Sequence, residues 1–333
     1  ELGYISAQQH EAALKEPLVL KRELVEYAVH AEYVAEMARQ ITAERFPEEI
    51  YSRGMKVYTT LIKAEQDAAY ISLRKGVMDY DRRHGYRGAE SFVDMKDFKS
   101  DQDEAIDEVL QDIPDAGDQI PGLVLSVNTK QIKVYRKGGE VLTLSGDAMK
   151  FAAKMIDEKA PANKRLKRSA IIRLQKDDKG AWQISQLPEV ESAFVAVDPK
   201  NGAIRALVGG FDFNRNKFNH VTQAWRQPGS SFKPFIYSAA LEKGYSPNSV
   251  IADEPIVIPA SQTGTAAWEP HNYDGKYEGP MRMRTALAKS KNMVSIRILQ
   301  SIGTRYAQDY AARFGFDAAK HPPYLTMALG AGS

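Results

Sequence analysis

The amino-acid sequence predicts a mixed α/β protein with more than one domain. The chain has 333 residues, which is more than one ordinary core needs. Short stretches with strand character and intervening turn residues fill 121–186, and helical periodicity lies on both sides of them. A composition of 43% hydrophobic and 26% charged residues is typical of folded domains.

Composition also excludes several classes of protein. A net charge of +2, from 45 basic and 43 acidic residues, argues against a nucleic-acid partner. The absence of cysteine excludes disulfides, thiolate catalysis and cysteine-bound zinc. The six histidines are scattered without metal-ligand spacing, and the glycine pairs lack the lysine of a phosphate-binding loop, so we expect neither a metal nor a cofactor. No window approaches the ~18 uninterrupted apolar residues of a membrane span.

The first two segments are predicted to be largely helical. Residues 1–50 have helical periodicity interrupted at Pro17, which predicts a connector or the end of a preceding domain. Residues 51–83 combine a predicted strand at 55–62 with a helix, whose face is formed by Tyr70, Leu73, Val77 and Tyr80. Strand followed by helix indicates entry into an α/β unit.

Residues 84–188 are predicted to form a small β-rich domain. Its first part is polar and acidic from Asp101 to Asp118, which favours a solvated or mobile stretch. A meander, a short helix and a hairpin follow, and several short strands around one helix favour an oligonucleotide/oligosaccharide-binding (OB) type of barrel. The predicted strands are 123–127, 131–135, 140–144, 170–174 and 182–186, and the predicted helix is 148–156.

Residues 189–333 are predicted to form the last domain. It opens with a hairpin of strands 193–198 and 203–208, and becomes helical from Ser230, with Gly244 and Gly303 as C-terminal caps. Both ends of the chain look cut, because no initiator methionine or signal peptide opens it and no stop signal closes it. We therefore expect a fragment of a longer protein.

The segment 226–235, Arg-Gln-Pro-Gly-Ser-Ser-Phe-Lys-Pro-Phe, has the residues of a nucleophilic site. Pro234 fits only in the first turn of a helix, which places Ser230 at the helix N-terminus, where free N–H groups can stabilise an oxyanion. Lys233 lies three residues later on the same face and could accept the serine proton if partial burial or a nearby positive charge lowered its pKa. Taken alone, Ser-x-x-Lys is weak evidence, since an isolated match indicates a serine cap beside a solvated lysine.

A second motif strengthens this hypothesis. Ser290-Lys291-Asn292 lies between two apolar helical segments, where the hydroxyl could face the first site and the Asn292 amide could orient a peptide. Capping of the following helix is its simpler interpretation. Upstream, Trp268 and Tyr273 could form an aromatic wall for a substrate, and core packing explains them about equally well.

Together these motifs resemble the class A penicillin-binding proteins of Gram-negative type, which share a fold and the Ser-x-x-Lys and Ser-x-Asn pair with class A β-lactamases. The likeness covers nearly the whole chain. Residues 3–6 resemble the end of that family's glycosyltransferase domain, 53–62 its entry strand into the transpeptidase domain, and 268–273 the segment before its Ser-x-Asn motif. The β-rich part at 84–188 is similar to its inserted accessory domain. The implied fold is a truncated penicillin-binding/β-lactamase-like transpeptidase domain with an inserted OB-like domain and a helical N-terminal linker.

The resemblance implies that Ser230 attacks the D-Ala–D-Ala bond of a peptidoglycan stem peptide, with Lys233 as base and Ser290 as proton relay. Asn292 would hold the donor peptide, and β-lactams would acylate the same serine. For the parent protein it implies a lipid-linked precursor as a further substrate, cell-wall synthesis proteins as partners, and a membrane anchor on the periplasmic side of the inner membrane, outside this fragment.

Two departures leave alternatives open. The family's Lys-Thr/Ser-Gly motif does not occur among the 333 residues, and the glycosyltransferase carboxylates would lie before Glu1. A serine hydrolase of the carboxypeptidase or β-lactamase type would share Ser230 and Lys233. A non-catalytic β-lactam-binding scaffold would share them as well.

Overall fold

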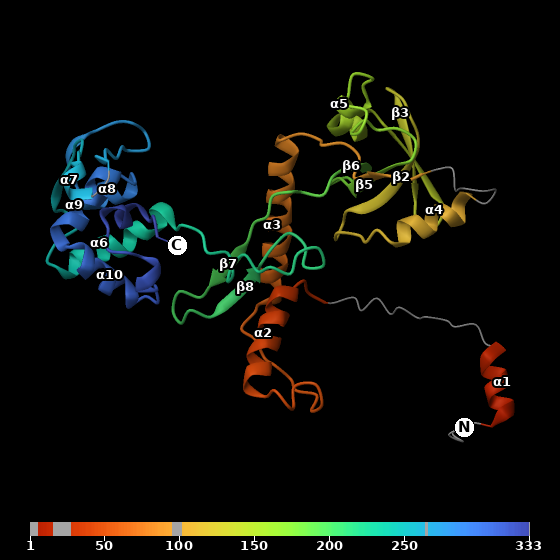
Figure 1. Ribbon diagram of the computed structural model, residues 1–333, viewed down its shortest axis with the longest axis horizontal. Helices are drawn as coiled ribbons and strands as arrows, with labels where there is room; N and C mark the ends of the chain where they lie inside the picture. Colours follow the sequence, from red (N-terminus) through yellow and green to blue (C-terminus); the bar gives the residue numbers. More distant parts are fainter. Residues whose placement is uncertain (1–5, 16–27, 95–101, 264–265, 333) are drawn as a thin grey trace. The chain divides into compact units, whose positions relative to one another are not determined.

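The computed structural model describes residues 6–15, 28–94, 102–263 and 266–332 (Figure 1). The chain divides into two units, Glu1–Gln223 and Ala224–Ser333, and each is described by itself. The predicted interruption at Pro17 and most of the 3–6 stretch lie outside the described residues. Among the helices of the described ranges, none is both long and apolar enough to span a bilayer.

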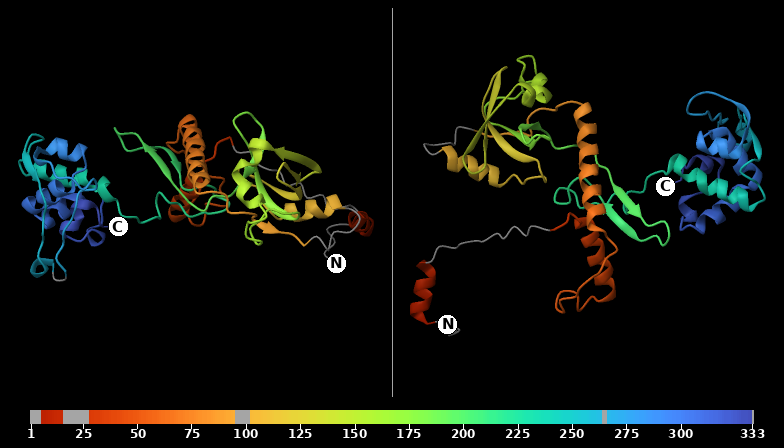
Figure 2. Two further views of the ribbon diagram at one scale, coloured as in Figure 1. Left: turned by 90° about the horizontal axis from the view of Figure 1, so that it is seen from above. Right: turned by 180° about the vertical axis from the view of Figure 1, so that it is seen from behind.

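The first unit begins with the predicted helices, α1 (Ala7–Lys15), α2 (Glu32–Arg45) and α3 (Lys63–Arg83). Helix α3 runs beside the hairpin of β7 (Phe194–Val197) and β8 (Ile204–Val208), as both views show (Figures 1 and 2). Leu73 and Val77 are buried against Phe211 and the hairpin, whereas Tyr80 is largely exposed. The buried Gln66 bonds both backbone groups of Leu207 and so ties the helix to the strand.

The strand predicted at 55–62 is wrong. This segment lies next to β8, but it makes one backbone hydrogen bond to it, from the Ile62 N–H to the Arg205 carbonyl (3.0 Å), and one from the Thr60 hydroxyl to the Ile204 carbonyl (2.6 Å). A strand needs a ladder of such bonds, and β-branched alternation reports only that a segment suits one.

The OB-like part confirms the predicted meander, helix and hairpin. Its sheet is antiparallel in the order β1-β5-β2-β3-β4, with β6 paired to β5. Val124, Ile132, Val134, Ile172 and Ile184 are among the fully buried residues of its core. The elements are β1 (Ser91–Phe92), β2 (Ile120–Val127), β3 (Gln131–Arg136), β4 (Glu140–Ser145), η2 (Gly146–Ala152), α5 (Ala153–Ile156), β5 (Ala170–Lys176) and β6 (Trp182–Ser185).

The acidic stretch before this sheet is not simply solvated, which corrects the sequence prediction. It contains α4 (Gln102–Gln111), which lies against β2 and β3 (Figure 2). Ile106 and Leu110 are each 1% exposed and pack against Leu123 and Tyr135. Two apolar residues four positions apart were enough to dock an otherwise acidic helix.

The second unit is mainly helical. Its core joins α6, α9 and α10, and it includes the buried Ile236 of α6, Val294 and Leu299 of α9, and Ala307 and Ala311 of α10. Strands β9 and β10 form a small antiparallel pair beside them. The elements are η3 (Gly229–Phe232), α6 (Lys233–Glu242), β9 (Val250–Asp253), α7 (Ala260–Thr263), β10 (Gly279–Arg282), α8 (Met283–Ala288), α9 (Asn292–Ile302), α10 (Thr304–Ala312), η4 (Ala318–Lys320) and η5 (Leu325–Leu329).

Candidate active site

Ser230 lies in a tight turn that leads into α6. The turn η3 is a single 3-10 segment, Phe232 anchors it in the core, and Pro234 occupies the first turn of α6 as predicted. Gly229, directly before the serine, has a left-handed backbone (φ 57°) that favours glycine. The Ser230 side chain is exposed, so its hydroxyl is accessible from outside.

A second glycine fixes this turn from a distant part of the sequence. The Gly229 N–H donates to the carbonyl of Gly330 (3.1 Å), which has φ 67°. A Cβ at Gly330 would lie 2.0 Å from the Gly229 carbonyl oxygen, closer than any non-bonded contact allows. The Gln227 amide adds a bond to the Ala331 carbonyl (3.1 Å). The backbone of the serine turn therefore rests on the chain after η5.

Lys233 is 1% exposed and its ammonium donates three hydrogen bonds. The acceptors are the Ser290 carbonyl (2.7 Å), the Ser290 hydroxyl (3.0 Å) and Asn292 Oδ1 (2.7 Å). All three are uncharged, so no carboxylate among them favours the protonated form of the buried lysine. Burial lowers the pKa of Lys233 to about 8, which brings the neutral form within reach near neutral pH.

The structure thus brings Lys233, Ser290 and Asn292 into direct contact, as the two motifs predicted. Ser230 precedes Lys233 on the same helical start, but no hydrogen bond joins the two side chains among the described residues. Ser290 has a left-handed backbone (φ 52°), a conformation that costs energy for a residue other than glycine. Surrounding contacts must therefore hold the Ser290–Asn292 loop.

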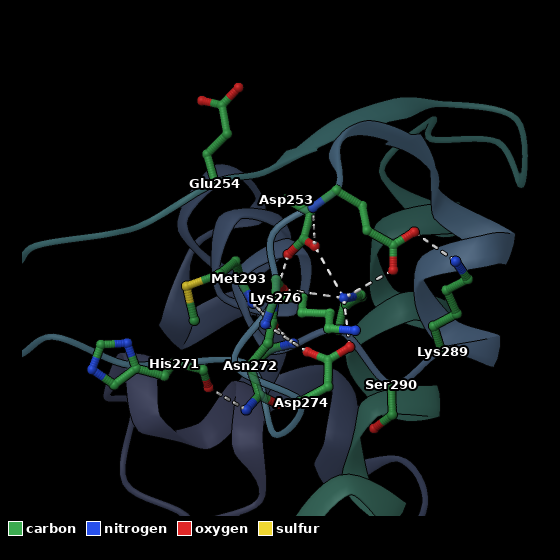
Figure 3. Close-up of polar contacts among 12 residues, drawn as sticks. Asp253, Glu254, His271, Asn272, Asp274, Lys276, Lys289, Ser290 and Met293 are labelled. Atoms are coloured by element: carbon green, nitrogen blue, oxygen red, sulfur yellow. Dashed lines mark hydrogen bonds and ion pairs between the residues drawn. The ribbon is translucent and has the colours of Figure 1, made fainter.

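Some of these contacts come from Asn272, which sequence reasoning missed. Its Oδ1 accepts from the N–H groups of Asn292 (2.8 Å) and Met293 (3.3 Å), so it caps α9 from another segment. Its Nδ2 donates to Asp253 (2.7 Å), and Asn292 Nδ2 donates to the His271 carbonyl (2.8 Å). Figure 3 shows these contacts around the loop.

Comparison with known proteins identifies the family. The profile of the penicillin-binding protein OB-like domain matches residues 86–190, and that of the penicillin binding protein transpeptidase domain matches 192–323. Penicillin-binding protein 1A of Neisseria lactamica is 44% identical over 98% of this chain, and that of Vibrio cholerae is 42% identical over 99%. The chain belongs to the class A penicillin-binding proteins.

The solved penicillin-binding protein 1A of Haemophilus influenzae has the same fold. It is 38% identical, and its TM-score of 0.84 applies over 99% of this chain and 47% of that one. The predicted fold class, an OB-like domain followed by a transpeptidase domain, is confirmed. The chain spans about two fifths of the length of the curated penicillin-binding proteins it matches, 41% in both species named.

The two aromatic residues of the predicted substrate wall differ in their surroundings. Trp268 packs against the core of the second unit and exchanges two backbone hydrogen bonds with Ile258 (2.8 and 2.9 Å), as the core-packing interpretation expected. Tyr273 is fully exposed. Their contribution to substrate binding stays a prediction. The 268–273 segment of this penicillin-binding protein contributes Asn272 to the site by direct contact.

Proposed function

We propose that this chain carries the acyl-transfer site of a peptidoglycan D,D-transpeptidase. The single observation that supports it best is the pairing of an exposed serine at a helix start with a buried lysine whose three acceptors are uncharged. A lysine in such surroundings can give up its proton at moderate cost, which a general base requires.

The acylation step uses Ser230 and Lys233. Neutral Lys233 takes the Ser230 proton while Oγ bonds to the carbonyl carbon of the D-Ala–D-Ala bond, and the Ser230 N–H, at the start of the helix, would favour the oxyanion. The carbon–nitrogen bond then breaks, and the departing D-Ala amine receives a proton from Lys233 through the Ser290 hydroxyl. The products are free D-Ala and an ester on Ser230.

The transfer step regenerates the free hydroxyl of Ser230. An amine from a neighbouring stem peptide attacks the ester, its proton passes to Lys233, and Ser230 leaves with a proton. Asn292 Nδ2 has a second hydrogen beyond its bond to His271, with which it would hold the donor peptide. Trp268 and Tyr273 would border the same peptide. A β-lactam would acylate Ser230 by the first step and remain attached.

The longer protein would act on the periplasmic side of the inner membrane, held there by an anchor in another part of its chain. A glycosyltransferase domain would take the lipid-linked precursor, and other cell-wall synthesis proteins would bind nearby. No metal or cofactor enters either step of the transfer.

Labelling of the full-length protein with a fluorescent penicillin tests the acylation step. We expect one label per chain in the wild type and in Ser231→Ala, and none in Ser230→Ala. Ser231 is the matched control, since it is also exposed and lies in the same turn. Equal labelling of Ser230→Ala and wild type would refute Ser230 as the nucleophile.

A donor peptide ending in D-Ala–D-Ala, supplied with an amine acceptor, tests the transfer step. A cross-linked product is the expected result. Hydrolysed donor alone would favour a carboxypeptidase, and labelling without either product would favour a binding scaffold.

A further inference from the structure

A second lysine of the same loop, Lys291, has no role in the proposed chemistry, yet it is 2% exposed. Its ammonium lies 3.0 Å from Asp274, 3.0 Å from Glu278 and 3.4 Å from Asp253. It also donates to the Lys276 carbonyl (3.2 Å). We call Asp253, Asp274 and Glu278 the carboxylate cluster. Figure 3 shows that Asp253 and Asp274 belong to separate segments of the chain.

Lys291 and its two neighbours in the chain contact different partners. Ser290 and Asn292 accept hydrogen bonds from Lys233, whereas the Lys291 ammonium contacts the carboxylate cluster. Because the three residues are consecutive, fixing the Lys291 side chain restricts where the oxygens of Ser290 and Asn292 can lie.

The cluster is itself tied to the start of α9. Asp253, which is fully buried, accepts from Asn272 Nδ2 (2.7 Å) and from the Glu278 N–H (3.0 Å). Asn272 in turn caps the Asn292 and Met293 N–H groups. Among the described residues, Lys291 is the cation within ion-pair distance of Asp253. Without its charge, Asp253 would stay buried with no compensating cation.

Electrostatic evidence agrees with this geometry. Burial alone would lower the pKa of Lys291, but the carboxylates of Asp274, Glu278 and Asp253 outweigh it and raise this pKa above the ordinary lysine value. Lys291 therefore stays charged throughout the pH range in which Lys233 would titrate. Lys289 also pairs with Glu278 (2.5 Å), but its side chain is half exposed.

We infer that Lys291 is a positioning residue for acylation: its ammonium, held by the carboxylate cluster, fixes the Ser290 and Asn292 oxygens that receive Lys233. The inference rests on the proposed function. It predicts that removing the Lys291 charge loosens the loop, admits water to Lys233 and moves the Lys233 pKa upward toward that of a solvated lysine.

The test compares Lys291→Met with Lys289→Met in the full-length protein. The second-order rate of labelling by fluorescent penicillin is measured from pH 6 to 10, and the end-point label gives the concentration of competent sites. Because small displacements in an active site are costly, we expect Lys291→Met to lose at least about tenfold in rate per competent site and to shift its pH midpoint upward. Lys289→Met should stay within about twofold of wild type, since its ion pair is exposed.

The outcomes are distinct. An unlabelled wild type would refute the proposed function itself. If wild type labels, a Lys291→Met protein with unchanged rate per site and unchanged pH midpoint would overturn the inference, even if fewer sites were competent. If Lys291→Met shows no melting transition, Asp253→Asn decides, because it removes the charge of the fully buried carboxylate that lies 3.4 Å from the Lys291 ammonium. A slower rate with a raised midpoint supports the inference, and wild-type behaviour overturns it.

Discussion

The surroundings of Lys233 and Lys291 differ in one respect that decides their chemistry. Both side chains are almost completely buried, at 1% and 2% exposure. Lys233 donates to three uncharged oxygens, and its pKa falls to about 8 because burial is not offset. Lys291 is buried too, but three carboxylates raise its pKa. The charge of the acceptors, and not burial, thus separates a potential base from a structural cation.

The largest difference between the two lysines should appear when each is replaced by arginine. Arg keeps the positive charge but does not release its proton in proteins, so Lys233→Arg should lower the acylation rate by roughly 10²–10⁴-fold. Lys291→Arg retains the charge that the carboxylate cluster needs and should cost far less. Penicillin labelling rates of both variants measure the difference. Activity of Lys233→Arg within about tenfold of wild type would mean that another group takes the proton.

The buried part of the carboxylate cluster should matter more for stability than its exposed part. Asp253→Asn leaves the 2%-exposed Lys291 with less compensation and should reduce the free energy of unfolding by about 3 kcal/mol. Asp274→Asn should reduce it much less, because the Asp274 side chain is half exposed. Denaturant unfolding of both variants tests this order, and equal losses would contradict it.

The two lysines should have opposite effects on stability as pH changes. The pKa of Lys233 is lower in the folded state than in the unfolded chain, so stability increases as pH rises between about 8 and the ordinary lysine value. The pKa of Lys291 is raised, so its contribution is complete below the ordinary lysine value and declines as pH rises through its folded pKa.

The acylation rate should follow Lys233 alone. We expect it to increase with pH to a midpoint of about 8, and to fall about tenfold for each pH unit below 7, because the neutral lysine is the active form. A rate that is independent of pH between 6 and 9 would contradict a titrating lysine base.

Added salt should produce the smallest effect. The half-exposed Lys289–Glu278 pair is open to screening, whereas Lys291 and its partner Asp253 are both buried. Raising the salt concentration to 1 M should therefore change the acylation rate by less than about twofold. A larger loss would indicate that the exposed pair also holds the loop.

Local patterns in the sequence were sufficient for the serine turn and for most helices and strands. Pro234 restricts where α6 can begin, and the periodicity of Leu73 and Val77 is a property of α3 alone. The contacts between segments could not be predicted in this way. Asn272 caps a helix that begins twenty residues later, because its Oδ1 accepts a hydrogen bond from the Asn292 N–H. The carboxylates that contact Lys291 belong to segments that only folding brings together.

The predictions that were wrong, for residues 55–62 and for α4, failed for the same reason. The segment 55–62 has the composition of a strand, but strand formation depends on a partner elsewhere, and β8 supplies one backbone bond. The segment that forms α4 was predicted to be solvated because its acidic residues outnumber Ile106 and Leu110. The burial of these two residues depends on strands that come later in the sequence. Asn272 lies between Trp268 and Tyr273 in the same short segment, and no local pattern indicates that its amide contacts a loop twenty residues later.

The bond between Gly229 and Gly330 also bears on when the turn that contains Ser230 can form. These residues are about a hundred positions apart, so the serine turn depends on closing a long loop of chain. A ribosome would have to release the segment after η5 before this backbone contact could form. A Gly330→Ala substitution would place a Cβ 2.0 Å from the Gly229 carbonyl oxygen, so the same contact could not form in this geometry even after synthesis ends.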